Sequence, residues 1–156
     1  METPVVYAST DAWSIVGCGS VLVSVWRTEV QLAGIDATET AIVSLLERTR
    51  RDWYGSVSVI EPSMSLRMSE EARAASTALQ RRWMGRMRCS AYVVEGNSFA
   101  MAAVRTMTAG MSLVTRSPYP IKSFSDAVSA AEWVSAILEM TPAMVLATIA
   151  RARAVR

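Results

Sequence analysis

The residue types that could carry catalysis are scarce in this chain. It has 156 residues and no histidine, so the side chain most often used as a general acid or base near neutral pH is absent. A serine nucleophile would need a basic partner, and Lys122 is the only lysine. The segment Gly17-Cys18-Gly19 leads into a strand-like run and not into a helix, unlike a dinucleotide-binding turn. We therefore predict that the protein is not an enzyme and binds no cofactor.

The two cysteines do not form a metal-binding pattern. Cys18 and Cys89 lie far apart in the sequence, and no histidine is present to complete a zinc site. Isolated cysteines of this kind are usually small, reduced, buried residues. We predict no metal site and no catalytic residue.

Polar residues gather in two loops that follow strand-like runs. In the first loop, Glu61, Ser63 and Ser65 precede Ser69, which is expected to cap a helix. The second loop contains Glu95, Asn97 and Ser98. Hydroxyl groups that precede helices can bind phosphate or another anion, and ligands of β/α domains usually lie at strand ends. Serines that only form turns and helix caps are the alternative interpretation.

Charge and hydropathy exclude several classes of protein. The formal net charge is +2, and the arginines at 81, 82, 86 and 88 fall near a helix end, where they complement the helix dipole. We therefore expect no nucleic-acid partner. No apolar run is long enough to span a membrane. The first residues lack the pattern of a signal peptide, so we expect a cytoplasmic protein.

Apolar periodicity predicts alternating strands and helices in one domain. Strand-like runs cover 5–7, 13–16, 21–26, 56–60, 89–94 and a short segment from 121, and the second and third form a hairpin. Helical patterns cover 36–50, with Asp36 and Glu39 as a capping box, 69–84, 99–114, a fourth segment capped by Ser123 or Ser125, and 142–155 after Thr141. This order indicates an α/β fold with a mostly parallel sheet.

The same patterns predict the core. On the fourth helix, Val128 is expected to point inward. The residues expected to be mostly buried are Leu45, Leu46, Val59, Ile60, Leu79, Trp83, Val93, Ala102, Val134 and Ile137.

This order of elements, with Glu61-Pro62-Ser63 before the second helix and the segment Ile121–Ala131 near the end, resembles the STAS superfamily, which includes SpoIIAA-like anti-sigma-factor antagonists. The resemblance implies a STAS-like domain over 1–140, and 141–156 would be an appended helix of the same structural unit. Regulatory members end the strand before the second helix in Asp-x-Ser, so the resemblance makes Ser63 a candidate phosphoacceptor. Glu61 stands where those members have Asp.

Two functions follow as expectations. The first is a non-enzymatic protein–protein interaction module in bacterial cytoplasmic signalling or assembly, with phosphorylation as its regulator and the first loop as the contact surface. The apolar side of the last helix would be covered by the domain itself or by a second copy in a homodimer. The alternative is a carrier of a small molecule or lipid, with a cavity lined by Met101, Met107 and Met111.

Overall fold

A six-stranded sheet forms the centre of the molecule. The computed structural model describes residues 2–65, 67–95, 102–106 and 117–156. The strands are β1 (Val5–Ser9), β2 (Trp13–Cys18), β3 (Val21–Trp26), β4 (Tyr54–Ile60), β5 (Met87–Val94) and β6 (Ile121–Phe124). The named helices are α1 (Leu32–Thr49), α2 (Glu70–Trp83), α4 (Ala127–Leu138) and α5 (Pro142–Ala154), and the short 3₁₀ helix Met84–Arg86 follows α2.

The strands lie side by side in sequence order, β1 to β6. β1, β2 and β3 are antiparallel neighbours, and β3 to β6 are all parallel. The predicted hairpin, the edge strand and the mostly parallel sheet are therefore confirmed. Residues of β3, β4 and β5 pair in level rows, such as Leu22, Ser56 and Ser90, or Ser24, Ser58 and Tyr92.

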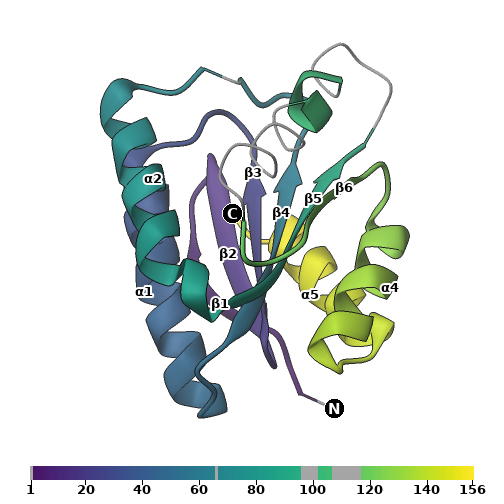
Figure 1. The fold of residues 1–156 in the computed structure, drawn as a ribbon. Coiled ribbons are helices and arrows are strands. Elements are labelled where there is room, and N and C mark those ends of the chain that lie inside the picture. The colour runs from purple at the N-terminus through teal and green to yellow at the C-terminus, as the bar shows by residue number, and fades with distance from the viewer. Residues whose placement is uncertain (1, 66, 96–101, 107–116) are drawn as a thin grey trace.

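Two pairs of helices cover the two faces of the sheet. α1 and α2 lie on one face, and α4 and α5 lie on the other (Figure 1). The face toward α4 and α5 is a tightly packed core of valines and small residues from β3, β4 and β5, with Val134, Leu138 and Ile149 from the helices. The sheet and the two pairs of helices therefore form three layers, with the sheet in the middle.

α1 begins earlier than predicted. Its first residue is Leu32, after an N-cap at Gln31, so Asp36 lies inside the helix and does not cap it. Gly34 lies inside α1, where a side chain would not fit, because a Cβ there would come within 2.7 Å of the Trp26 ring. Glycine therefore allows α1 and β3 to pack closely at this point.

Two of the predicted N-cap residues are confirmed, and the prediction for a third helix is wrong. Ser69 accepts a hydrogen bond from the backbone N–H of Ala72, and Thr141 accepts one from Met144. α4 is capped by Asp126 and not by Ser123 or Ser125. An aspartate directly before the helical pattern is as good a cap as serine, and Asp126 also accepts a hydrogen bond from the Ser129 hydroxyl.

The predicted core is confirmed at Leu45, Leu46, Val59, Val93 and Val134. Ile137 is only half-buried, and Val128 and Ala102 are exposed. Val128 lies on the outer side of the first turn of α4, which contradicts the inward direction predicted for it. Ile60, Leu79 and Trp83 are also half-buried. These three residues line a cavity between α2 and the sheet.

α5 packs beside α4 on the same face of the sheet. Val145, Thr148, Ile149 and Ala152 are buried against β2 and β3 of the same chain. The apolar side of this helix is thus covered within the chain, so a homodimer through α5 would have to use its exposed side. No helix in the described part of the chain is long and apolar enough to cross a membrane.

Candidate functional site

A cavity of about 270 Å³ lies between the sheet and the helices α1 and α2. All four residues of β4 that face α1 and α2 line it, from Tyr54 at the start of the strand to Ile60 at its end. A strand rises about 3.3 Å per residue, so the cavity runs roughly 20 Å along the sheet. Its shape is a slot that suits an elongated small molecule better than a compact one.

The slot exists because α2 stands away from the sheet. The close backbone contacts of α2 are with α1 and with the short helix that follows α2, whereas α1 contacts β1, β2 and β3. Ala72 is the only fully buried residue of α2. The sheet below α2 also bears small side chains, so the two layers do not fill the space between them.

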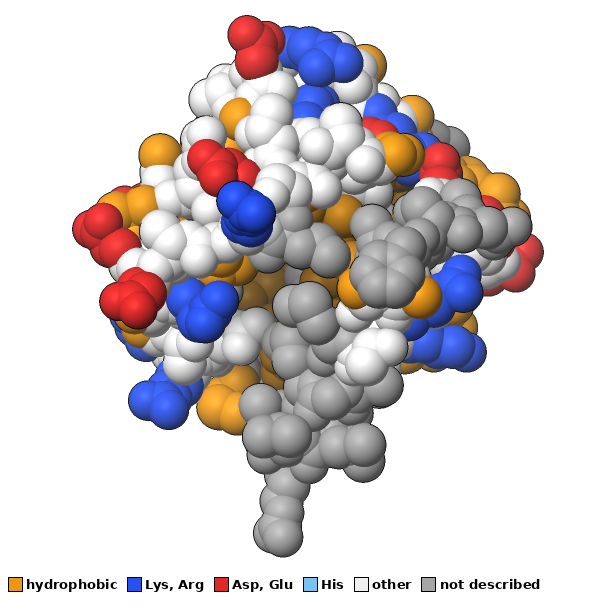
Figure 2. Space-filling model, turned by 90° about the horizontal axis from the view of Figure 1, so that it is seen from above, with side chains coloured by type: hydrophobic (Ala, Val, Ile, Leu, Met, Phe, Trp, Pro, Cys, Tyr) orange, Lys and Arg blue, Asp and Glu red, His pale blue; other side chains and the backbone are white. Residues whose placement is uncertain are grey.

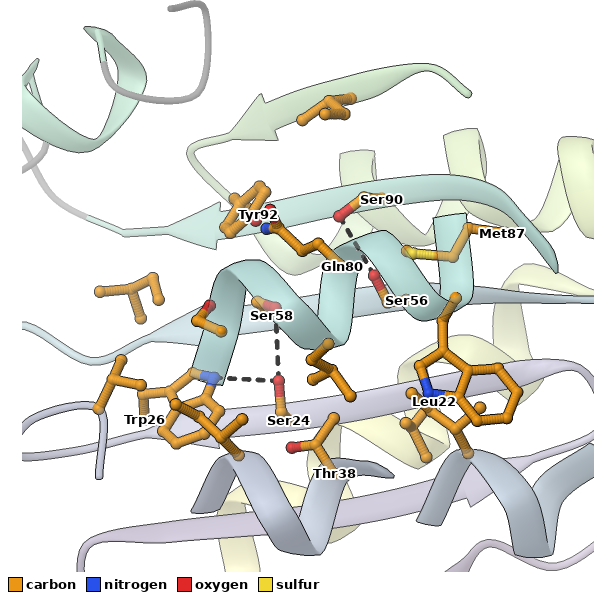
Figure 3. A pocket seen from close by; sticks show the side chains of 18 of the residues that line it. Leu22, Ser24, Trp26, Thr38, Ser56, Ser58, Gln80, Met87, Ser90 and Tyr92 are labelled. Carbon is orange, nitrogen blue, oxygen red and sulfur yellow. Dashed lines mark hydrogen bonds between the residues drawn. The ribbon is translucent and has the colours of Figure 1, made fainter. Parts of the chain in front are cut away.

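Serines form a polar strip across the sheet floor of the slot. The Ser24 hydroxyl accepts a hydrogen bond from the indole N–H of Trp26 at 3.1 Å and lies 3.3 Å from the Ser58 hydroxyl. Ser56 and Ser90 pair at 3.1 Å in the neighbouring row (Figure 3). These pairs satisfy hydroxyls that would otherwise lie unpaired against an apolar space.

The helix side of the slot is mostly apolar. Leu79, Trp83 and the amide-bearing Gln80 reach into it from α2, and Ser76 lies one turn earlier. The indole N–H of Trp83 is buried and has no hydrogen-bond partner among the described residues. An unpaired buried donor is uncommon in a folded protein. It is therefore the feature of this wall that most needs a chemical explanation.

No Asp, Glu, Lys or Arg is found among the described residues that line the slot. Three tyrosines line it, and burial raises the pKa of Tyr54, Tyr92 and Tyr119, so their phenols remain neutral at physiological pH. The described lining of the site is therefore uncharged and mostly apolar, with hydroxyl and indole donors.

The upper end of the slot lies where β4 ends. Met64 and Met68, from the loop between β4 and α2, line it there together with Ile60 and Val30. In the view onto this end of the molecule, hydrophobic side chains are visible in a depression near the middle, and charged side chains lie around its edge (Figure 2). Methionine side chains are flexible enough to adapt to different apolar molecules.

The loop that carries the predicted phosphoacceptor forms part of this cavity wall. Ser63 is exposed, and its hydroxyl donates a 2.7 Å hydrogen bond to the carbonyl of Arg27 at the end of β3. The backbone N–H of Ser65 donates to the carbonyl of Thr28. Both bonds hold the loop against β3, next to Met64.

The two predicted polar loops meet at one arginine. Arg153 of α5 forms ion pairs with Glu61 at 3.7 Å and with Glu95 at 2.8 Å. The structure thus brings together one acidic residue from each loop. Asn97 and Ser98 lie outside the described residues, and so do Met101, Met107 and Met111. Ser69 serves as the cap of α2.

A buried arginine fixes α5 beside these loops. The guanidinium of Arg27 donates to the carbonyls of Ala152 at 3.0 Å, Arg153 at 3.4 Å and Val155 at 2.9 Å. Burial, followed by the nearby charge of Arg156, lowers the pKa of Arg27. A cation at the last carbonyls of a helix is favourable. Arg27 therefore closes the C-terminal end of α5.

Sequence reasoning missed the slot and the burial of Arg27. One signal was available: β3 and β4 alternate valine with serine, as in Ser56-Val57-Ser58-Val59. Alternation at period two gives one valine face and one serine face. Small polar residues in the middle of a central strand indicate a face that is not tightly packed. Nothing in the local sequence marks Arg27 as buried.

Comparison with known proteins gives one informative likeness. No family model and no curated protein matches this chain. A solved structure of an uncharacterized protein of the DUF3478 family from Shewanella loihica, described as having a SpoIIAA-like fold, is similar with a TM-score of 0.55 and 13% identity. The alignment covers 86% of this chain and 95% of that one. The chain therefore has a SpoIIAA-like fold, as its sequence predicts.

Proposed function

We propose that this protein is a non-catalytic binding domain that holds a small apolar molecule between its sheet and the helices α1 and α2. The observation that carries the proposal is the uncharged slot of about 270 Å³. Cavities that bind small molecules are mostly apolar and have a few placed polar groups. The serine strip and the Trp83 indole are such groups.

The lining of the slot favours an apolar occupant. Most of the described residues that line it are apolar, and removing apolar surface from water is favourable by about 25 cal/mol per Å². An apolar molecule that covers these side chains would therefore be stabilised in the slot.

Two adjacent residues of α2 provide a matched test. Ser76 lines the slot, and Thr77 is exposed on the outer side of the helix. We expect wild-type protein and Thr77→Leu to bind the neutral, elongated dye 1,6-diphenylhexatriene with equal affinity in a fluorescence titration. Ser76→Leu fills part of the slot and should weaken binding about tenfold or more, because overpacking costs about 1–3 kcal/mol. Equal binding by both variants, or no binding by the wild type, would exclude the slot as the site.

The loop surface supports a second function, contact with a protein partner under the control of Ser63. The observation in its favour is that Arg153 ties Glu61 and Glu95 together. The loop predicted as the contact surface and the second polar loop thus meet at an ion-paired surface beside α5. Ser63 is exposed in the first of these loops, so a kinase could reach its hydroxyl. Phosphate there would add nearly two negative charges next to Glu61.

A further inference from the structure

We propose that the ligand of the slot is an uncharged amphiphile whose carbonyl or ether oxygen accepts a hydrogen bond from the indole N–H of Trp83. This inference rests on the proposed function, because it names the chemical class of the molecule that the slot holds. Two independent observations carry it: the unpaired donor at Trp83 and the lack of a charged residue in the described lining of the slot.

The first observation sets the polar group of the ligand. Indole nitrogen is a donor only, and that of Trp83 is buried without a partner among the described residues. The other indole in the slot, that of Trp26, donates to Ser24. Of these two tryptophans, Trp83 is the one whose indole N–H is available to a ligand. A buried donor gains most from an acceptor oxygen.

The second observation sets the charge of the ligand. A carboxylate or phosphate would enter a space whose described lining has no cation, and burying an unpaired charge is costly. Arg86 lies over the ring of Trp83, with its guanidinium carbon 5.5 Å from the ring centroid, but it is exposed and does not line the slot. A neutral carbonyl compound satisfies the donor without this cost.

The volume sets the size of the ligand. About 270 Å³ corresponds to roughly nine water-sized units of about 30 Å³ each. The roughly 20 Å length of the slot favours a linear molecule over a compact ring system. 2-Octanone is linear, is small enough to enter this volume and carries the acceptor oxygen. Octane lacks the acceptor, and octanoate carries a charge.

The experiment compares these three probes on wild-type protein and on Trp83→Phe, by calorimetric titration at pH 7. The phenylalanine ring keeps an aromatic wall and removes the N–H. We expect 2-octanone to bind wild type at least about a hundredfold more tightly than octanoate. Trp83→Phe should weaken 2-octanone about fivefold more than it weakens octane, because the usual net effect of one hydrogen bond is of that size and the loss of ring area affects both probes.

The outcomes separate this inference from the function on which it rests. Octane binding that persists in Trp83→Phe shows that the variant folds and retains the slot. If that variant loses no more affinity for 2-octanone than for octane, the role of Trp83 is wrong. Octanoate binding as tightly as 2-octanone would overturn the neutral ligand and indicate that Arg86 reaches the site. If none of the three probes binds wild type, the proposed function itself fails.

Discussion

Ser63 links the predicted regulatory loop to the wall of the slot. Its hydroxyl is bonded to the carbonyl of Arg27, and the next residue, Met64, lines the slot. A phosphate on this oxygen removes the donor from the bond and places negative charge beside Glu61. The loop would then lose one of the two bonds that hold it to β3, the other being that of Ser65.

Substitutions at Ser63 separate the effect of charge from the loss of the hydrogen bond. Ser63→Ala and Ser63→Glu should both lower the free energy of unfolding by about 1 kcal/mol, because each removes the bond to the Arg27 carbonyl. A partner identified by pull-down and titrated against all three proteins should bind wild type and Ser63→Ala alike. Its affinity for Ser63→Glu should change about fivefold or more. Equal affinities for all three would leave Ser63 as an ordinary loop serine.

Helices α2 and α5 meet the sheet in opposite ways. α5 buries its inner side against β2 and β3, and Arg27 of the sheet binds the carbonyls at its C-terminal end. α2 contacts α1 and leaves a space above the serines of β3 and β4. We therefore propose that α5 is an integral part of the domain and that α2 is the element that adjusts to a ligand.

Replacement of Arg27 tests the docking of α5. Arg27→Met keeps much of the volume and removes the guanidinium donor from the carbonyls of Arg153 and Val155, whereas the Ala152 carbonyl keeps its hydrogen bond from Ser14. We expect this variant to lower the free energy of unfolding in urea by about 3 kcal/mol. The control is Arg151→Met, which changes an exposed arginine of the same helix and should cost less than about 1 kcal/mol. Similar small losses for both variants would mean that α5 is docked by its apolar side alone.

The whole molecule is one sheet with two unequal faces. The face toward α4 and α5 is packed with valine, alanine and leucine and has the character of a structural core. The face toward α1 and α2 has bulky aromatic residues near its edges and serines in the middle, and it encloses the slot. The face toward α4 and α5 is therefore the structural core, and the binding function that we propose belongs to the other face of the same strands.

The sequence predicts this architecture because strand order, helix faces and the parallel sheet follow from local periodicity. It does not predict the slot, because the distance of α2 from the sheet depends on contacts with α1 that lie far apart in sequence. Local rules also fail at Gly34. Glycine disfavours a helix interior, yet Gly34 lies inside α1, at a position where the Trp26 ring leaves no room for a side chain. The sequence indicated the Ser63 loop as a candidate site, but it did not predict the hydrogen bond from the Ser63 hydroxyl to the Arg27 carbonyl.

The central claim is that an apolar molecule occupies the slot, and methionine methyl groups test it most directly. Met64, Met68 and Met87 line the slot, and Met140 packs against the opposite core. With protein labelled at methionine methyl carbons and saturated with 2-octanone, we predict intermolecular nuclear Overhauser effects from the ligand to Met64, Met68 and Met87. Met140 should show none. Contacts confined to other methionines, or no contacts at saturation, would contradict the account.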